Sequence, residues 1–164
     1  MDIAMIMQRL ILVLLLMLSS LGRLSAATLL TKYNAAQLDS LLRTKSRNIV
    51  VFLYTDWCRF CRAMEQTTFR NESVINGLNE KFYFVVLNAE EKAEIIFNGQ
   101  KFNYKPTGAN TGVHELGEKL GRVKGQVSYP SVCVLNAHGE IMARHAGFIS
   151  STDLLSILNA TKAK

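Results

Sequence analysis

Cysteine is scarce in this sequence of 164 residues, which contains only Cys58, Cys61 and Cys133. Three cysteines cannot form the framework of several disulfides that stabilises small secreted domains. They provide only one Cys-x-x-Cys pair, whereas a structural zinc site normally takes four ligands from two such pairs. The other candidate zinc ligands, none at the spacing of a zinc knuckle, are Cys133, His114, His138 and His145. The pair therefore favours redox chemistry over zinc binding, and no metal or organic cofactor is implied.

The chain also lacks a run of arginines and a ladder of aromatic residues, although its formal net charge is +6. Its basic residues are scattered: Lys45, Arg47, Arg59, Arg62, Lys119, Arg122 and Lys124. Nucleic-acid modules instead gather such side chains on one face or along one helix. We therefore predict a solvated basic surface and no nucleic-acid partner. Such a surface favours acidic partners through long-range attraction.

The first 27 residues have the pattern of a secretory signal peptide. Arg9 precedes an apolar run over residues 10–18, and small side chains at residues 25–27 suit a cleavage site near Ala27. The run is too short for an ordinary transmembrane helix, but the apolar residues 3–7 leave an uncleaved anchor as the alternative. We therefore expect an exported protein, periplasmic or extracellular. Residues 28–164 are long enough for one domain with its own core.

Apolar periodicity in residues 28–164 predicts strands and helices in turn. The expected strands are residues 49–53, 81–87, 131–135 and 140–144, and the expected helices begin near Asn34, Cys61, Asn71, Val113 and Ser151. Asn98-Gly99 predicts a β-hairpin between residues 94–97 and 100–104, and residues 106–112 are expected to form a polar loop. The order predicts an α/β domain with a mixed central sheet and helices on both sides.

The Cys-x-x-Cys pair lies at the junction between the strand at residues 49–53 and the helix that begins near Cys61. Free backbone N–H groups and the dipole at a helix N-terminus stabilise a thiolate, so we expect Cys58 to be partly exposed and acidic. Cys61 follows about one helical turn later, close enough to form a disulfide with Cys58. The sequence therefore predicts a redox-active dithiol.

Trp57-Cys58-x-x-Cys61 after the first strand and Tyr129-Pro130 before a later one resemble the thioredoxin fold. The chain is similar to secreted thioredoxin-like disulfide reductases, in particular to the C-terminal domain of the bacterial membrane reductase DsbD. The residues that carry this similarity are 56–65, Phe69, Asn71, Val74, 78–79 and 82–87. The resemblance covers residues 49–158 and implies that the hairpin around Asn98-Gly99 and the loop to Gly112 are an insertion.

This resemblance implies a role for each residue of the site. Cys58 would be the attacking thiol and Cys61 the resolving thiol. Pro130 would be a cis-proline facing the disulfide, whereas the residues alone also allow an ordinary proline at the start of a strand. Substrate-binding residues would be Trp57, Arg59, Phe60, Tyr129 and Pro130.

Two positions depart from the thioredoxin pattern. Phe52 stands where thioredoxin buries an acid, so another group or water must take the proton of the resolving thiol. Phe60 precedes Cys61 in place of proline or histidine, so the dipeptide does not by itself classify the enzyme. We further expect Cys133 to be buried and inert, and the three histidines to lie at the surface or to serve local structure.

Together these observations predict an exported thiol:disulfide oxidoreductase that reduces or isomerises disulfides in client proteins. A membrane protein is the expected electron donor, and a monomer is the expected state. The alternative is a non-catalytic binding module in which the thioredoxin fold presents its groove or inserted hairpin to a partner.

Overall fold

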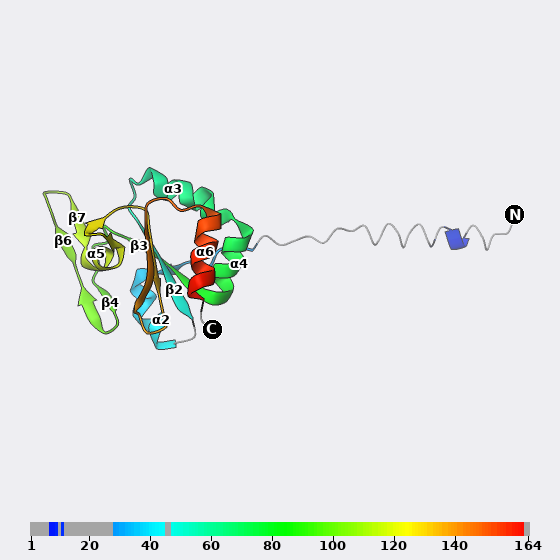
Figure 1. Ribbon diagram of the computed structural model, residues 1–164, viewed down its shortest axis with the longest axis horizontal. Coiled ribbons are helices and arrows are strands. Elements are labelled where there is room, and N and C mark those ends of the chain that lie inside the picture. The colour runs from blue at the N-terminus through cyan, green and yellow to red at the C-terminus, as the bar shows by residue number, and fades with distance from the viewer. Residues whose placement is uncertain (1–6, 10, 12–27, 45–46, 163–164) are drawn as a thin grey trace.

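A five-stranded mixed sheet forms the centre of the computed structural model, which describes residues 7–9, 11, 28–44 and 47–162 (Figure 1). The strand order is β1-β3-β2-β10-β11. The strands are β1 (Tyr33–Asn34), β2 (Asn48–Tyr54), β3 (Phe82–Asn88), β10 (Ser131–Leu135) and β11 (Ile141–Ala146). β1, β3 and β2 are parallel, while β10 and β11 add antiparallel pairs, so the predicted mixed sheet is confirmed.

Helices cover both faces of this sheet (Figure 1). On one face lie α2 (Leu38–Thr44) and α5 (Glu115–Gly121), and on the other lie α3 (Arg59–Gln66), α4 (Glu72–Lys81) and α6 (Ser151–Thr161). The short helices η1 (Ala35–Gln37) and η2 (Thr68–Arg70) precede α2 and α4. None of the helices in the described ranges is long and apolar enough to cross a membrane. The predicted signal peptide lies almost wholly outside those ranges.

Alternate residues of β2 belong to two separate cores, as the period of a strand requires. Ile49, Val51 and Leu53 pack with α2 and α5, and Val50 and Phe52 pack with α3, α4 and α6. All five are at most 1% exposed. β2 is therefore buried on both faces, and its carboxyl end holds the Cys-x-x-Cys pair in place.

The helix caps follow the sequence signals closely. Asn34 and Gln37 form the predicted capping box at η1, and the Asn71 side chain accepts the N–H of Val74 at the start of α4. The predicted cap of the last helix was one residue late, because Ser150, rather than Ser151, accepts the N–H of Asp153.

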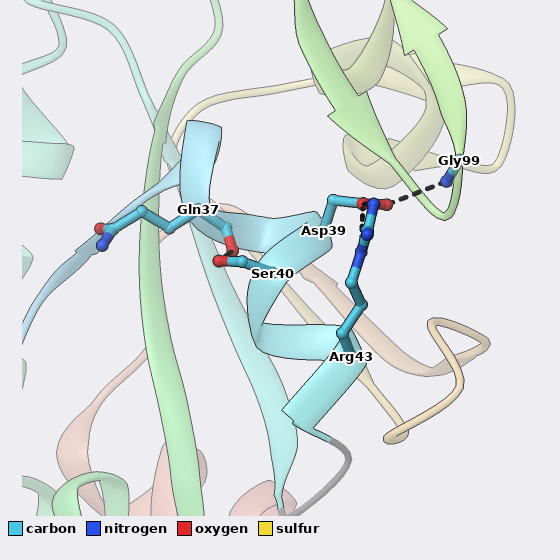
Figure 2. A network of polar contacts seen from close by, with 5 residues as sticks. All are labelled: Gln37, Asp39, Ser40, Arg43 and Gly99. Atoms are coloured by element: carbon cyan, nitrogen blue, oxygen red, sulfur yellow. Dashed lines mark hydrogen bonds and ion pairs between the residues drawn. The ribbon is translucent and has the colours of Figure 1, made fainter.

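The predicted hairpin is present as β4 (Ile95–Phe97) and β5 (Gln100–Phe102). Asn98 and Gly99 have φ of 52° and 72°, as a two-residue turn of this kind needs. Figure 2 shows how the turn is attached to α2: Asp39 accepts the N–H of Gly99 at 2.9 Å and is also hydrogen-bonded to Arg43. These contacts hold the pKa of the Asp39 carboxyl below its usual value.

Two further hairpins were not predicted. β6 (Tyr104–Pro106) and β7 (Gly112–His114) pair at the ends of the segment expected to be only a loop. β8 (Arg122–Val123) and β9 (Gln126–Val127) pair on either side of a turn. Their strands have two or three residues each, too few for apolar alternation to reveal. Because β7 extends to His114, α5 begins at Glu115 rather than at Val113.

Candidate active site

Cys58 caps the N-terminus of α3, immediately after the loop that leaves β2. It forms a disulfide with Cys61, and the two Cα atoms are 5.2 Å apart. The Cys58 sulfur accepts the backbone N–H of Cys61 at 3.0 Å. The loop is fixed by a second bond, from the Cys58 N–H to the Thr55 carbonyl at 3.1 Å. The predicted junction of strand and helix thus places a helix-terminal N–H donor at the sulfur of Cys58.

Both sulfur-bearing residues are nearly covered in this disulfide form. Cys58 is 4% exposed and Cys61 is 2% exposed. The expectation that Cys58 is partly exposed was therefore wrong for the oxidised pair. The reason is that both residues pack into the apolar core formed by α3, α4, α6 and β2.

The aromatic residues beside the disulfide are arranged as a small platform. Trp57 is 64% exposed and packs edge-on against Tyr129, with ring centroids 6.3 Å apart. The Tyr129-Pro130 bond is cis, and the Pro130 carbonyl accepts the N–H of Gly147. The structure therefore brings Tyr129 to the cysteine loop, although residues 57 and 129 are far apart in the sequence.

Glu90 is a site residue that sequence reasoning missed. Its carboxylate accepts the indole N–H of Trp57 at 3.0 Å. Together with burial, which is the main cause, Glu90 raises the pKa of Tyr129. Glu90 follows β3, the parallel neighbour of β2, so the carboxyl ends of both strands meet at one edge of the sheet. The position of Glu90 just after the strand that neighbours β2 was the signal from which its place at the site could have been predicted.

Arg59 and Phe60, between the two cysteines, extend into solvent. Phe60 is 66% exposed, and Arg59 is also exposed. Both side chains are accessible to a partner that approaches the disulfide. Their assignment as substrate-binding residues stays a prediction.

Phe52 occupies the position of the missing acid. It is 1% exposed, and its ring packs against Phe69 with centroids 4.8 Å apart. The two nearby carboxylates named by the sequence are at the surface: Asp56 accepts from Asn88, and Glu65 pairs with Lys32. Neither carboxylate is buried beside the cysteines.

Cys133 and His114 are buried titratable residues away from the disulfide. Burial raises the pKa of the Cys133 thiol to about 12, although the effect of Arg144 opposes this shift. The raised pKa fits the prediction that Cys133 is inert. His114 is fully buried rather than at the surface. It serves local structure, because its Nδ1 accepts the N–H of Leu116 at the start of α5. Among the described residues, no cluster of His, Cys, Asp or Glu could hold a metal ion.

The disulfide of the Cys-x-x-Cys pair lies at the N-terminus of a helix that follows a central parallel strand, and a cis-proline opens a later strand of the same sheet. This arrangement defines the class of thiol:disulfide oxidoreductases with a thioredoxin fold. The comparisons with known proteins agree with this class. The chain belongs to the thioredoxin-like domain family, whose family model matches residues 35–162.

Several solved structures are similar to this one. A thioredoxin from Thermus thermophilus has 19% identity and a TM-score of 0.56, over 80% of this chain and 85% of its own. DsbH oxidoreductase has 17% identity and a TM-score of 0.52, over 86% and 92%. Thioredoxin f from spinach chloroplast has 18% identity and a TM-score of 0.51, over 82% and 87%. At these sequence identities, the structural similarity shows that the proteins share a fold.

No curated protein sequence matches the chain significantly. The predicted similarity to the C-terminal domain of DsbD therefore stays a prediction within the broader family.

Proposed function

We propose that this oxidoreductase is exported and reduces or isomerises disulfides in client proteins. The observation that carries the proposal is the disulfide at the N-terminus of α3, with the Cys58 sulfur at the helix-capping position. A sulfur at this position is stabilised as a thiolate once the pair is reduced, which is the form that attacks disulfides.

The reaction uses both cysteines in turn. The Cys58 thiolate attacks one sulfur of a client disulfide, forms a mixed disulfide and releases the first client thiolate. Cys61 then loses its proton and attacks the Cys58 sulfur, which re-forms the intramolecular disulfide and releases the second client thiolate. Two electrons pass to the client, and its two thiolates take up two protons.

The surroundings of the disulfide support an extended client segment. The exposed Trp57 ring packs against the half-buried Tyr129 ring, and the cis Tyr129-Pro130 bond immediately precedes β10. An extended segment gains affinity from backbone hydrogen bonds and specificity from side-chain contacts. We assign Arg59 and Phe60 to the same binding surface because both are exposed next to the cysteines.

Export follows from the pattern of residues 1–27 and requires a source of electrons outside the cytoplasm. A membrane protein that passes electrons to Cys58 and Cys61 would supply them. The pair would then cycle between its reduced form and the disulfide.

The alternative binding module has less support. The inserted β4–β5 hairpin does not stand free, since Ile95, Phe97 and Phe102 are buried in the core under α2 and α5. Lys119 of α5 also lies over the Phe102 ring at 4.9 Å. The hairpin is thus largely a part of the domain core.

A trapping experiment tests the proposal. Cys61→Ser should accumulate mixed disulfides between Cys58 and client proteins, because the second step is blocked. Cys58→Ser is the matched control and should trap none. If Cys61→Ser captures no more protein than Cys58→Ser under non-reducing conditions, the chain is a binding module rather than an enzyme.

A further inference from the structure

An open groove of about 540 Å³ runs along α3, on the side of the helix next to the N-terminal segment of the domain. Its walls are formed by that segment, by α3 and by η2, and the residues that line it are Leu29, Leu30, Lys32, Arg62, Glu65, Gln66, Phe69 and Arg70. The first residue of α3 that lines the groove is Arg62, which directly follows Cys61 in the sequence. It is separate from the platform of Trp57 and Tyr129, because neither residue lines it.

One wall of the groove is held firmly by Asn79 of α4. The Asn79 side chain accepts the N–H of Thr31 at 2.9 Å and donates to the carbonyl of Leu29 at 2.8 Å. A single amide thus binds two backbone groups of the N-terminal segment. The segment continues to Lys32, whose ammonium pairs with Glu65 of α3 at 3.3 Å. The groove is therefore a formed surface rather than a gap beside a loose end.

The groove carries an excess of positive charge. Three basic side chains line it, Lys32, Arg62 and Arg70, against the single carboxylate of Glu65. Glu65 is paired with Lys32, and Arg62 donates to the neutral backbone carbonyl of Asp56. Within the part of the chain that the structure describes, no hydrogen bond or ion pair engages the exposed guanidinium of Arg70. Two guanidinium charges thus remain uncompensated.

Apolar surface lies between these charges. Leu29 is 82% exposed and lines the same groove as Leu30 and Phe69. A ligand that matches this surface combines carboxylates with at least one apolar side chain. Its distance from the dithiol is short, since α3 rises only about 6 Å between Cys61 and Glu65.

We propose that this groove is a second docking site, which binds an acidic segment with an apolar side chain on the partner protein while its thiols or disulfide meet Cys58. Charge complementarity is the basis for this occupant. The proposal rests on the proposed function, because it names the chemistry of the partner in the same exchange reaction. It adds a site outside the residues that surround the disulfide.

A binding measurement that needs no redox chemistry tests the site. The probe is a fluorescent, cysteine-free peptide with several glutamates and one leucine, and its control has glutamine in place of each glutamate. The glutamate peptide should bind in low salt, and Arg70→Glu should weaken binding by about three- to tenfold, as expected for reversal of one exposed charge. Arg70→Gln should have a smaller effect in the same direction.

Lys81→Glu is the matched control variant. It makes the same change of charge at an exposed residue of α4. Lys81 precedes Phe82, which pairs with Asn48 at the start of β2, at the opposite end of that strand from Cys58. It should leave peptide binding unchanged. Equal weakening by Arg70→Glu and Lys81→Glu would overturn the proposal, because only net charge would then matter. Equal binding of the glutamate and glutamine peptides would overturn it as well.

A lipid surface is the other ligand with this chemistry, and vesicles distinguish it. Binding to vesicles that contain phosphatidylglycerol, without binding to the glutamate peptide, would assign the groove to a membrane and overturn the proposal.

A second assay follows reduction of a disulfide peptide with an acidic flank. Arg70→Glu should lower its kcat/KM but not that of the same peptide with a neutral flank. Peptide binding without any disulfide reduction would reject the proposed function and leave the groove intact as a binding site.

Discussion

The sulfur atoms of Cys58, Cys61 and Cys133 differ in their surroundings. The sequence located the first two at the junction of strand and helix, and the structure places them there. It also predicted a buried Cys133, because Val132 and Val134 flank it in an apolar strand. It could not reveal the neighbouring Arg144, which reaches Cys133 only through the pairing of β10 with β11.

Alkylation of the reduced protein should separate the three thiols. Cys58 should react first with iodoacetamide, because the helix N-terminus stabilises its thiolate, the form that reacts. Cys133 should react last, since burial raises the pKa of its thiol to about 12. Mass spectrometry of the native protein at neutral pH measures the order. Equal labelling of Cys58 and Cys133 would contradict it.

Removal of the odd cysteine should affect stability and not exchange. Cys133→Ala should leave disulfide exchange nearly unchanged and lower the free energy of unfolding by about 1 kcal/mol, from lost packing. Chemical denaturation and an insulin-reduction assay measure the two quantities. Loss of exchange with an intact fold would place Cys133 in the chemistry.

Glu90 and His114 mark the limit of sequence reasoning at single residues. Each lies outside the regular apolar pattern and contacts a partner in a loop: Trp57 for Glu90, and Ala93 for His114. Periodicity reports which side chains face a core, but not which polar group meets another across a loop.

At the scale of elements, long apolar segments were predictable and short polar ones were not. The turn residues Asn98-Gly99 revealed the β4–β5 hairpin because left-handed backbone has a strong sequence preference. β6 and β7 enclose the polar segment from Thr107 to Thr111 and carry no such alternation. Their pairing depends on tertiary contacts such as the bond from the His114 N–H to the Ala89 carbonyl.

The cap of α5 should make stability depend on pH. His114 Nδ1 accepts from Leu116, so Nε2 carries the proton and donates to the Ala93 carbonyl at 3.2 Å, which requires a neutral ring. Burial lowers the pKa of His114 below 6.5. Below that pH the unfolded chain therefore binds more protons than the folded one, and the free energy of unfolding should decrease as pH falls from about 6.5 towards the pKa of the folded state.

A matched variant isolates this contribution. His114→Asn keeps a capping oxygen but cannot titrate, so its stability should vary less with pH over the same range, at a cost of about 1 kcal/mol near neutral pH from the lost bond to Ala93. Urea denaturation of both proteins at a series of pH values measures the difference. Parallel curves would show that His114 is not the group responsible.

At the scale of the whole molecule, the order of strands and helices was sufficient to predict a mixed sheet with helices on both faces. The positions of Trp57-Cys58-x-x-Cys61 and Tyr129-Pro130 in that order then indicated the thioredoxin fold, and the family model and the strand order confirm it. The sequence did not predict where the inserted hairpin packs. The apolar side of the β4–β5 hairpin is part of the core, because Phe97 and Phe102 are buried among residues of α2 and α5.

The direction of electron flow is the central claim, and the reduction potential of the Cys58–Cys61 pair tests it most directly. The helix N-terminus favours the reduced form, but no histidine precedes Cys61 to add the stabilisation found in strong oxidants. We expect a potential between about −270 mV, the thioredoxin value, and about −180 mV, that of protein disulfide isomerase. Equilibration with glutathione followed by thiol trapping measures it. A value near −120 mV, that of DsbA, would contradict a reductase and indicate an oxidant of client thiols.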